Sequence, residues 1–244
     1  MRVAVAGATG RTGGEVVAEA DERGHAVLAL SREPTDEQRD LADLPAILRD
    51  EASVLVDFTV PGATVEHARI AAETGTPIVI GTTGFDDAQL DALDDAAAEV
   101  PILRASNFAK GVQALLRVVR AGVEALPEYD VEVTETHHHG KRDAPSGTAT
   151  TVLDEIDSAR GDALDRVYGR EGNHVREQSE VGVHVRRAGT VRGEHEVMLA
   201  GDDEVLTLTH RAESRRVFAA GAVDAAEWLV DRDPGRYDFT EVLS

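Results

Sequence analysis

The densest group of chemically active side chains lies in residues 135–148, which read ETHHHGKRDAPSGT. Three histidines, one lysine and one arginine fall within residues 137–142 and form a concentrated cationic patch in an otherwise acidic chain. A histidine exchanges a proton near neutral pH, and a desolvated lysine can share that task. The cluster therefore predicts a site that binds a small anionic molecule and moves a proton on it.

The end of this cluster is predicted to begin a helix that runs to about Ser158. Ser146, Gly147 and Thr148 stand at its start, where hydroxyl groups and free backbone amides can bind a carboxylate at the positive end of the helix. This placement favours a carboxylate-bearing substrate beside the histidines.

Three other interpretations of the cluster compete with proton transfer. His137 and His139 could ligate a metal on one face of a strand, but neither an HExxH nor a two-His-carboxylate spacing is present, and we predict no metal site. A hydrolase triad of Ser146, a histidine and Asp143 lacks the G-x-S-x-G turn, because Pro145 precedes the serine. A solvated polar loop is the third alternative.

A second candidate site follows the first predicted strand, Val3–Ala6, where residues 7–13 read GATGRTG. Glycines at this position let the backbone approach a pyrophosphate, whose charge is met by free N–H groups at the start of the next helix. The spacing is G-x-x-G-x-x-G rather than G-x-G-x-x-G, so a glycine turn that only packs helix on strand is the alternative. Its place after an N-terminal strand favours dinucleotide binding.

The next predicted strand, Ala26–Leu30, is followed by the residues that select the dinucleotide. An arginine at this position suits the 2′-phosphate of NADP, and a carboxylate suits the ribose diol of NAD. Ser31 and Arg32 favour NADPH, whereas Glu33 leaves NADH possible. The alternative is that Arg32 is an ordinary solvated surface charge that binds no cofactor. Two further loops, residues 57–61 (DFTVP) and 81–85 (GTTGF), have the small and hydroxyl side chains that can line a nicotinamide ribose.

The elements that position both sites alternate between strand and helix in the first half of the chain. Strands at 54–58, 78–80 and 102–105 alternate with helices at 11–23, 64–74 and 86–99, which predicts a doubly wound parallel sheet. After a helix at 112–126, strands at 130–136, 182–187, 190–200 and 204–211 look antiparallel and predict a second, α+β domain. A last helix, 216–229, could return to either domain.

Composition narrows the functional classes further. The 244 residues carry 46 acidic and 25 basic side chains, for a net charge of −21, which excludes a simple nucleic-acid binder. The absence of cysteine excludes disulfides and thiolate chemistry, and no apolar stretch approaches the length of a membrane span, so we expect a soluble, cytoplasmic protein. Only Lys110 and Lys141 are lysines, and this arginine-biased acidic surface suggests adaptation to concentrated salt, or merely an acidic protein.

The motifs together resemble the dihydrodipicolinate reductase family, also called 4-hydroxy-tetrahydrodipicolinate reductase. Residues 135–149 resemble its signature E-x-H-H-x-x-K-x-D-A-P-S-G-T-A. The resemblance extends to the glycine turn at Gly7, the DFT loop at Asp57, the GTTG loop at Gly81, the Asn107-Phe108 pair, and residues 182–195 with their G-x-x-x-x-R-x-G and GEH motifs.

The resemblance implies a specific enzyme. Its fold would be a Rossmann-like doubly wound domain, residues 1–108 with the returning C-terminal segment 217–244, and a substrate-binding and oligomerisation domain, residues 109–216, with a mostly antiparallel sheet. It would use NADPH, or NADH, to reduce a small dicarboxylate of diaminopimelate and lysine biosynthesis, as a homotetramer.

The resemblance also assigns roles to individual residues. His137 would be the catalytic proton donor or acceptor, and Lys141 would be a second proton donor. His138, Ser146, Gly147 and Thr148 would bind substrate carboxylates. The cofactor would lie along residues of four loops: Gly7, Ala8, Thr9, Gly10, Arg11, Thr12, Arg32, Gly81, Thr82, Thr83, Ala105, Ser106, Asn107 and Phe108. No role is implied for Lys110 or His139. An amino-acid dehydrogenase of Rossmann type, or a nonenzymatic NADP-binding sensor, would share the first half of the chain.

Overall fold

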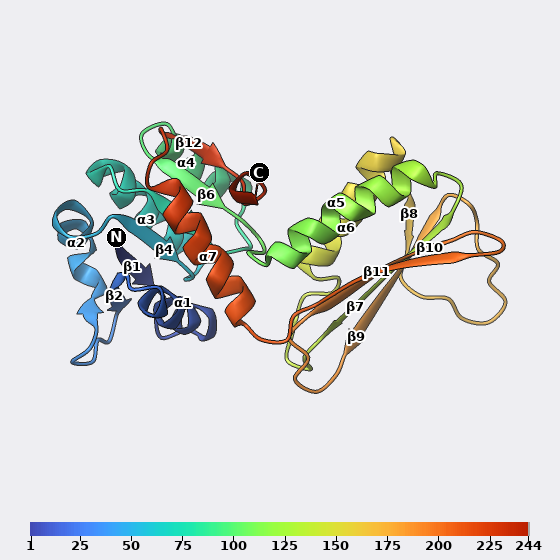
Figure 1. Ribbon diagram of the computed structural model, residues 1–244, viewed down its shortest axis with the longest axis horizontal. Helices are drawn as coiled ribbons and strands as arrows, with labels where there is room; N and C mark the ends of the chain where they lie inside the picture. The colour runs from blue at the N-terminus through green and yellow to red at the C-terminus, as the bar shows by residue number, and fades with distance from the viewer. Residues whose placement is uncertain (244) are drawn as a thin grey trace. The chain divides into compact units, whose positions relative to one another are not determined.

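The computed structural model describes residues 1–243, which form two compact units (Figure 1). Unit 1 holds Met1–Ala109 together with the chain from Arg215 onward, and unit 2 holds Lys110–Ser214. Each unit has its own sheet and its own apolar core, which is the property of an independent domain.

Unit 1 is built on a seven-stranded sheet whose strand pairs are all parallel, in the order β12-β6-β5-β4-β1-β2-β3. Its central strands are short apolar runs that are buried on both faces, as a sheet between two helical layers requires. The strands are β1 (Arg2–Ala6), β2 (Ala26–Ser31), β3 (Arg39–Asp40), β4 (Val54–Asp57), β5 (Ile78–Ile80), β6 (Pro101–Arg104) and β12 (Gly235–Tyr237).

Helices cover both faces of this sheet, and β1 shows how one strand serves both layers. Val3 and Val5 belong to the core shared with α1 and α7, whereas Ala4 and Ala6 belong to the core shared with α2, α3 and α4. The helices are α1 (Arg11–Glu22), α2 (Leu44–Asp50), α3 (Pro61–Thr74), α4 (Asp87–Ala97) and α7 (Arg216–Leu229), with 3-10 turns at Leu41–Asp43 and Glu241–Leu243. The predicted doubly wound sheet is confirmed. None of the helices within residues 1–243 is long and apolar enough to cross a membrane.

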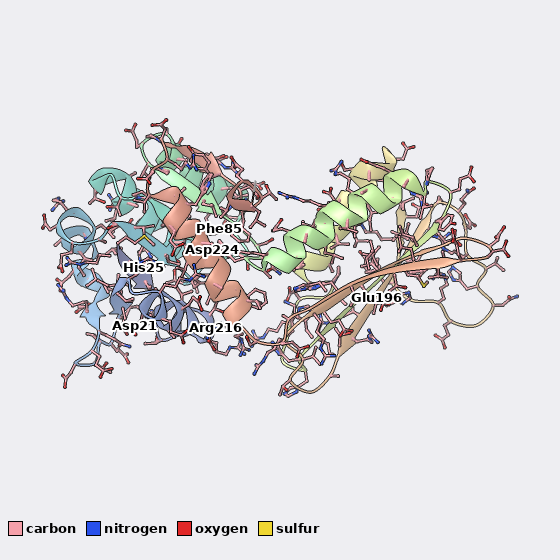
Figure 2. All side chains as sticks on the ribbon, in the orientation of Figure 1. Asp21, His25, Phe85, Glu196, Arg216 and Asp224 are labelled. Atoms are coloured by element: carbon pink, nitrogen blue, oxygen red, sulfur yellow. The ribbon has the colours of Figure 1, made fainter. Side chains whose placement is uncertain are left out.

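Helix α7 packs beside α1 in unit 1, although nearly two hundred residues separate them in the sequence. Several ion pairs join the helices; for example, Arg216 Nε lies 2.8 Å from Glu19 Oε2, and Arg23 Nη1 lies 2.9 Å from Asp224 Oδ1 (Figure 2 labels Arg216 and Asp224). The apolar side of α7 is buried in the same core as α1. The final segment then adds β12 to the edge of the sheet beside β6.

Unit 2 has a five-stranded sheet in the order β11-β10-β7-β9-β8, with two helices on one face. In β7 the residues at alternate positions, including Val131, Val133, Glu135 and His137, are buried, because they face α5 and α6 or the loops beside these helices. The elements are α5 (Lys110–Ala125), β7 (Asp130–His137), α6 (Gly147–Arg160), β8 (Asp165–Val167), β9 (Glu180–Arg187), β10 (Glu194–Ala200) and β11 (Val205–Arg211).

The α+β character of unit 2 is confirmed, but its sheet is mixed. β10 is antiparallel to both β7 and β11, whereas β9 runs parallel to β7 and to β8. β9 and β10 run in opposite directions, as the sequence predicted, but they do not pair across the Ala188-Gly189 turn, because β7 lies between them. This insertion brings Glu135 on β7 opposite His195 on β10 and Val185 on β9.

Candidate active site

The glycine turn between β1 and α1 has the geometry of a phosphate cradle. Gly7 has φ of 81°, and Gly10 N–H donates to its carbonyl at 2.9 Å. A Cβ added to Gly13 would lie 2.2 Å from the same carbonyl oxygen, so a side chain there is excluded. Gly10 caps α1 without a side-chain hydrogen bond, and the first turn of the helix carries no acidic residue. The positive helix end therefore fits a pyrophosphate.

Two exposed arginines flank this turn. Arg11 is the first residue of α1, and Arg32 follows the last residue of β2; neither guanidinium has a partner among the residues that the structure describes. Glu33 donates its backbone N–H to Ser31 Oγ at 3.2 Å, which turns the chain back after β2. Free guanidinium groups at this end of a dinucleotide-binding sheet suit a phosphate on the adenine ribose.

The other two predicted cofactor loops, residues 81–83 and 105–108, expose only some of their residues. Thr83 and Ser106 are exposed, whereas Thr82 is 5% exposed and its hydroxyl lies 3.1 Å from Asp57 Oδ1. Phe108 is buried between Phe58 and Phe239, with ring centroids 5.9 and 5.2 Å away. Asn107 Oδ1 accepts the Ala109 N–H at 2.8 Å. Thr82 and Phe108 therefore shape these loops with their side chains.

In unit 2, β7 ends in a buried carboxylate–imidazole pair. Glu135 Oε2 accepts a hydrogen bond from His137 Nδ1, and the two residues are 1% and 9% exposed. The i, i+2 spacing places both side chains on one face of the strand. Glu135 Oε1 accepts from Arg187 Nη2 and from the Ser146 N–H, both at 2.9 Å. Burial raises the pKa of Glu135, but the hydrogen bonds from His137 and Arg187 outweigh it and lower that pKa to about 2.

A second buried histidine completes this arrangement. His195 lies opposite Glu135 in β10, its ring centroid is 5.3 Å from that of His137, and its Nε2 lies 3.2 Å from Ser146 Oγ. Burial lowers the pKa of His195 to about 4, so the imidazole is neutral at pH 7. Its Nδ1 is buried without a hydrogen-bond partner within residues 1–243. A Cβ on Gly193 would approach His137 Nε2 to 3.1 Å, so glycine there leaves room for the ring.

Glu135, His137 and His195 could offer three ligand atoms within 4.8 Å of one another, as a metal site requires. Both oxygens of Glu135, however, already accept hydrogen bonds, and the Arg187 guanidinium lies 2.9 Å from one of them. A divalent cation would have to displace this arginine or sit beside its positive charge. The donor set therefore suits an oriented histidine better than a metal.

The remaining predicted substrate residues lie on the loop after β7 and at the start of α6. Lys141 Nζ forms an ion pair with Asp143 at 2.8 Å. Burial raises the pKa of Asp143, but the hydrogen bond and charge of Lys141 outweigh it and lower that pKa. Ser146 caps α6 by accepting the Ala149 N–H at 3.2 Å. Thr148 is 9% exposed, Gly147 is exposed, and His138 is half-buried.

The structure brings His137 and Ser146 together through Glu135, and it adds residues to which the sequence assigned no role. Arg187 and His195 belong to motifs visible in the sequence, but only strand pairing shows that they meet Glu135 and Ser146. The signal that could have found Glu135 is its i, i+2 spacing from His137 on a predicted strand. His139 is exposed and donates only its backbone N–H, to Gly189 at 3.2 Å.

A Rossmann-type unit with a phosphate cradle, linked in one chain to an α+β unit with an oriented histidine, defines a pyridine-nucleotide-dependent oxidoreductase. Comparison with known proteins agrees with this class. Residues 1–108 match the model of the N-terminal domain of dihydrodipicolinate reductase, and residues 111–243 match that of its C-terminal domain. The chain therefore belongs to the dihydrodipicolinate reductase family, whose members are oxidoreductases.

Individual relatives cover the whole chain. The 4-hydroxy-tetrahydrodipicolinate reductase of Natronomonas pharaonis is 64% identical, over 100% of both chains. That of Haloarcula marismortui is 50% identical, over 99% of this chain and 98% of its own. The solved structure of a dipicolinate-bound dihydrodipicolinate reductase from Paenisporosarcina sp. TG-14 superposes with a TM-score of 0.79 at 24% identity, over 98% of this chain and 97% of that one, and shows the same fold.

Proposed function

We propose that this chain reduces 4-hydroxy-tetrahydrodipicolinate to tetrahydrodipicolinate, with His137 and Lys141 as its proton donors. The observation that carries the assignment is the buried Glu135–His137 pair beside the N-terminus of α6, within the family's signature sequence. Bound NADPH supplies the hydride for the reduction. The protein holds the dicarboxylate and delivers the proton.

Glu135 orients His137 for this task. Because the ionised carboxylate accepts the Nδ1 proton, Nε2 is the ring nitrogen that exchanges a proton with the substrate. Arg187 compensates the buried charge of Glu135 and fixes its second oxygen. The Lys141 ammonium, held by Asp143, is the second donor. Enamine charge that develops on the substrate ring is quenched by these two groups.

The substrate carboxylates bind at the first turn of α6 and at His138. Gly147 and Thr148 present backbone N–H groups at the positive helix end, and Ser146 is held there by Glu135 and His195. A solved relative that holds dipicolinate, a dicarboxylate, supports this class of substrate. No metal takes part in the proposed reaction.

The cofactor lies along the loops of unit 1, and NADPH is preferred to NADH. The glycine turn from Gly7 to Thr12 holds the pyrophosphate, and Arg11 and Arg32 bind the 2′-phosphate, since both guanidinium groups are exposed and without a partner among residues 1–243. The remaining contacts come from Gly81, Thr82 and Thr83 and from residues 105–108. Residues 1–109 with α7 thus serve as the dinucleotide-binding domain, and unit 2 as the substrate-binding domain.

Unit 2 also mediates assembly into a homotetramer. The face of its sheet that bears Asp130, Glu132, His184, Glu196 and Met198 has no helix of unit 2 packed against it (Figure 2 labels Glu196). Its side chains are only half-buried. The protein acts in the cytoplasm at high salt, where its net charge of −21 keeps it soluble. Its mass in molar KCl, measured by sedimentation equilibrium, tests the assembly.

The decisive experiment follows NADPH absorbance in molar KCl, with substrate generated in situ from pyruvate and aspartate semialdehyde by the synthase that precedes this reaction. We expect NADPH consumption that depends on the synthase and is faster than NADH consumption. A folded protein that binds NADPH without turnover would point to a sensor, and turnover with amino acids instead would point to an amino-acid dehydrogenase.

A further inference from the structure

A second buried carboxylate–histidine pair lies in unit 1, where Asp57 ends β4 and His67 lies on α3. His67 Nδ1 is 2.6 Å from Asp57 Oδ2, and the residues are 5% and 0% exposed. Burial raises the pKa of Asp57, but hydrogen bonds from His67 and Thr59 outweigh it and hold the pKa below its usual value. A buried carboxylate is therefore kept ionised at the carboxyl edge of the parallel sheet.

The other oxygen of Asp57 gathers hydroxyl and amide groups from two loops. Asp57 Oδ1 lies 2.9 Å from Thr59 N, 2.7 Å from Thr59 Oγ1 and 3.1 Å from Thr82 Oγ1. Thr64 Oγ1 on α3 lies 3.0 Å from the same oxygen and 2.9 Å from Thr82 Oγ1. The Thr59 N–H also reaches Thr82 Oγ1 at 3.1 Å. One carboxylate thus ties the loop after β4 to the loop after β5.

Phe58 extends this connection to the glycine turn. A Cβ on Gly81 would lie 2.1 Å from the Phe58 ring, and a Cβ on Gly7 would lie 2.5 Å from the Phe58 carbonyl oxygen. The loops after β1, β4 and β5 are therefore in van der Waals contact around one residue, and the residue before it is Asp57. The hydrogen bonds of Asp57 reach the loops after β4 and β5, and the glycine turn is held separately by its own backbone hydrogen bond between Gly10 and Gly7.

A purely structural role does not explain this choice of residues. A buried carboxylate with hydrogen-bond partners is no more stabilising than well-packed apolar side chains of the same volume, because the carboxylate loses its hydration. The pair stands at the sheet edge where dinucleotides bind rather than in the middle of either core. Its hydrogen bonds lead to loop residues, Thr59 and Thr82, which are the groups whose positions a ligand at this edge would need fixed.

We propose that Asp57 and His67 are positioning residues that hold the loops after β4 and β5 in the shape that receives the nicotinamide half of the cofactor. This inference rests on the proposed function, since it takes those loops to be the cofactor site. The Thr82 hydroxyl is committed to the Asp57 network, so the loop offers its backbone groups and the exposed Thr83 to the cofactor. Loops that are ordered before binding reduce the entropy lost on binding.

The test compares two substitutions of His67 with a matched control. His67→Leu removes the donor to Asp57, whereas His67→Asn keeps an amide N–H near the position of Nδ1. Thr76→Val is the control, because Thr76 is 4% exposed and its hydroxyl donates to Leu48 O at 3.0 Å, outside the Asp57 network. Thr64→Val, which removes one hydroxyl at a site that is 0% exposed, is the second variant if His67→Leu does not fold.

The readouts are the Kd of NADPH and the Kd of adenosine 2′,5′-bisphosphate, which carries only the adenine half, measured by fluorescence and calorimetry on the full chain. We expect His67→Leu to raise the NADPH Kd about tenfold, His67→Asn to restore most of it, and the bisphosphate Kd to stay unchanged. Hydrogen exchange of the cofactor-free protein should quicken at residues 57–60 and 81–84 in His67→Leu, but not in Thr76→Val.

Two results would overturn the inference. One is an NADPH Kd in His67→Leu and Thr64→Val no higher than in Thr76→Val, and the other is an equal loss of affinity for both ligands. A wild-type protein that binds neither ligand would instead contradict the proposed function, so the two failures are distinguishable.

Discussion

Each unit buries one carboxylate–histidine pair, and the two pairs differ in what surrounds them. Around Asp57 the other neighbours are threonine hydroxyls and one backbone amide, and all of them donate to the carboxylate. Around Glu135 and His137 the neighbours are an arginine, a helix N-terminus and a second imidazole. The first set suits the proposed positioning of loops, whereas the second contains the groups that the proposed proton transfer requires.

The contrast also appears in the unpaired atoms. In unit 2, His195 Nδ1 is buried without a partner among residues 1–243, whereas both carboxylate oxygens of Asp57 in unit 1 accept hydrogen bonds. Buried polar atoms are normally hydrogen-bonded, and a catalytic role is one of the explanations for an exception. The same residue types are thus proposed to position loops in one unit and to transfer a proton in the other.

The largest expected effect concerns the proton donors. Lys141→Ala should lower kcat by roughly 10²-fold or more, the scale of general acid catalysis, with the unfolding midpoint unchanged, because the ammonium pairs only with Asp143 on a surface loop. Steady-state NADPH oxidation measures this. His139→Ala, two residues away and exposed, is the control and should keep the wild-type kcat. Equal losses in both variants would mean that any change to the loop is harmful and that Lys141 has no special role.

The next effect concerns the pH dependence of stability that the buried His195, beside Glu135 and His137, should produce. Its pKa of about 4 in the folded state is below the value of about 6.5 expected when unfolded, so the unfolded chain binds more protons between these values. Stability should therefore fall as pH is lowered from 6.5 to 4, with this residue contributing on the order of 3 kcal/mol. Urea unfolding of wild type and His195→Asn across this range measures the difference. Parallel curves would show that His195 does not titrate as expected.

A smaller effect is expected from Glu135→Gln. The amide can still accept the Nδ1 proton of His137, but it leaves the Arg187 guanidinium without its ion partner. We expect kcat to fall roughly tenfold and its pH profile to shift, because the charge that holds His137 in one orientation is lost. The KM for NADPH should stay within twofold or so of wild type. A change confined to KM would place Glu135 in binding.

The smallest difference should be between the salt dependence of the unfolding midpoint in variants of the two pairs. Screening acts on exposed charges and much less on buried ones, so KCl at molar levels should raise the unfolding midpoint of wild type, His67→Leu and Glu135→Gln alike. Thermal unfolding at increasing KCl checks this. An unfolding midpoint of wild type that is equally high in dilute buffer would remove the proposal of salt adaptation.

The sequence predicted much of this molecule because its signals are local. Periodicity predicted the doubly wound sheet, and α7 was predicted over its observed range, Arg216–Leu229. It missed α2 (Leu44–Asp50), β8 and β12, which are short and lack a clear pattern. The turn after β9 is typical of a hairpin with β10, and no local signal in the sequence indicates that β7, from far earlier in the chain, lies between these two strands.

The site was predictable in part for the same reason. The residues from Glu135 to Thr148 are contiguous, so their chemistry could be inferred directly from the sequence. The contacts of Arg187 and His195 depend on strand register, and the contact between Asp57 and His67 depends on how α3 packs against β4. Such contacts require the folded chain.

One measurement tests the distinction between the two pairs most directly: kcat and the NADPH Kd determined side by side for His137→Ala and His67→Leu. The account predicts that His137→Ala loses roughly 10²-fold or more in kcat with an unchanged Kd, and that His67→Leu raises the Kd about tenfold with little change in kcat at saturating NADPH. A loss of kcat in His67→Leu as large as that in His137→Ala, or a wild-type kcat in His137→Ala, would contradict it.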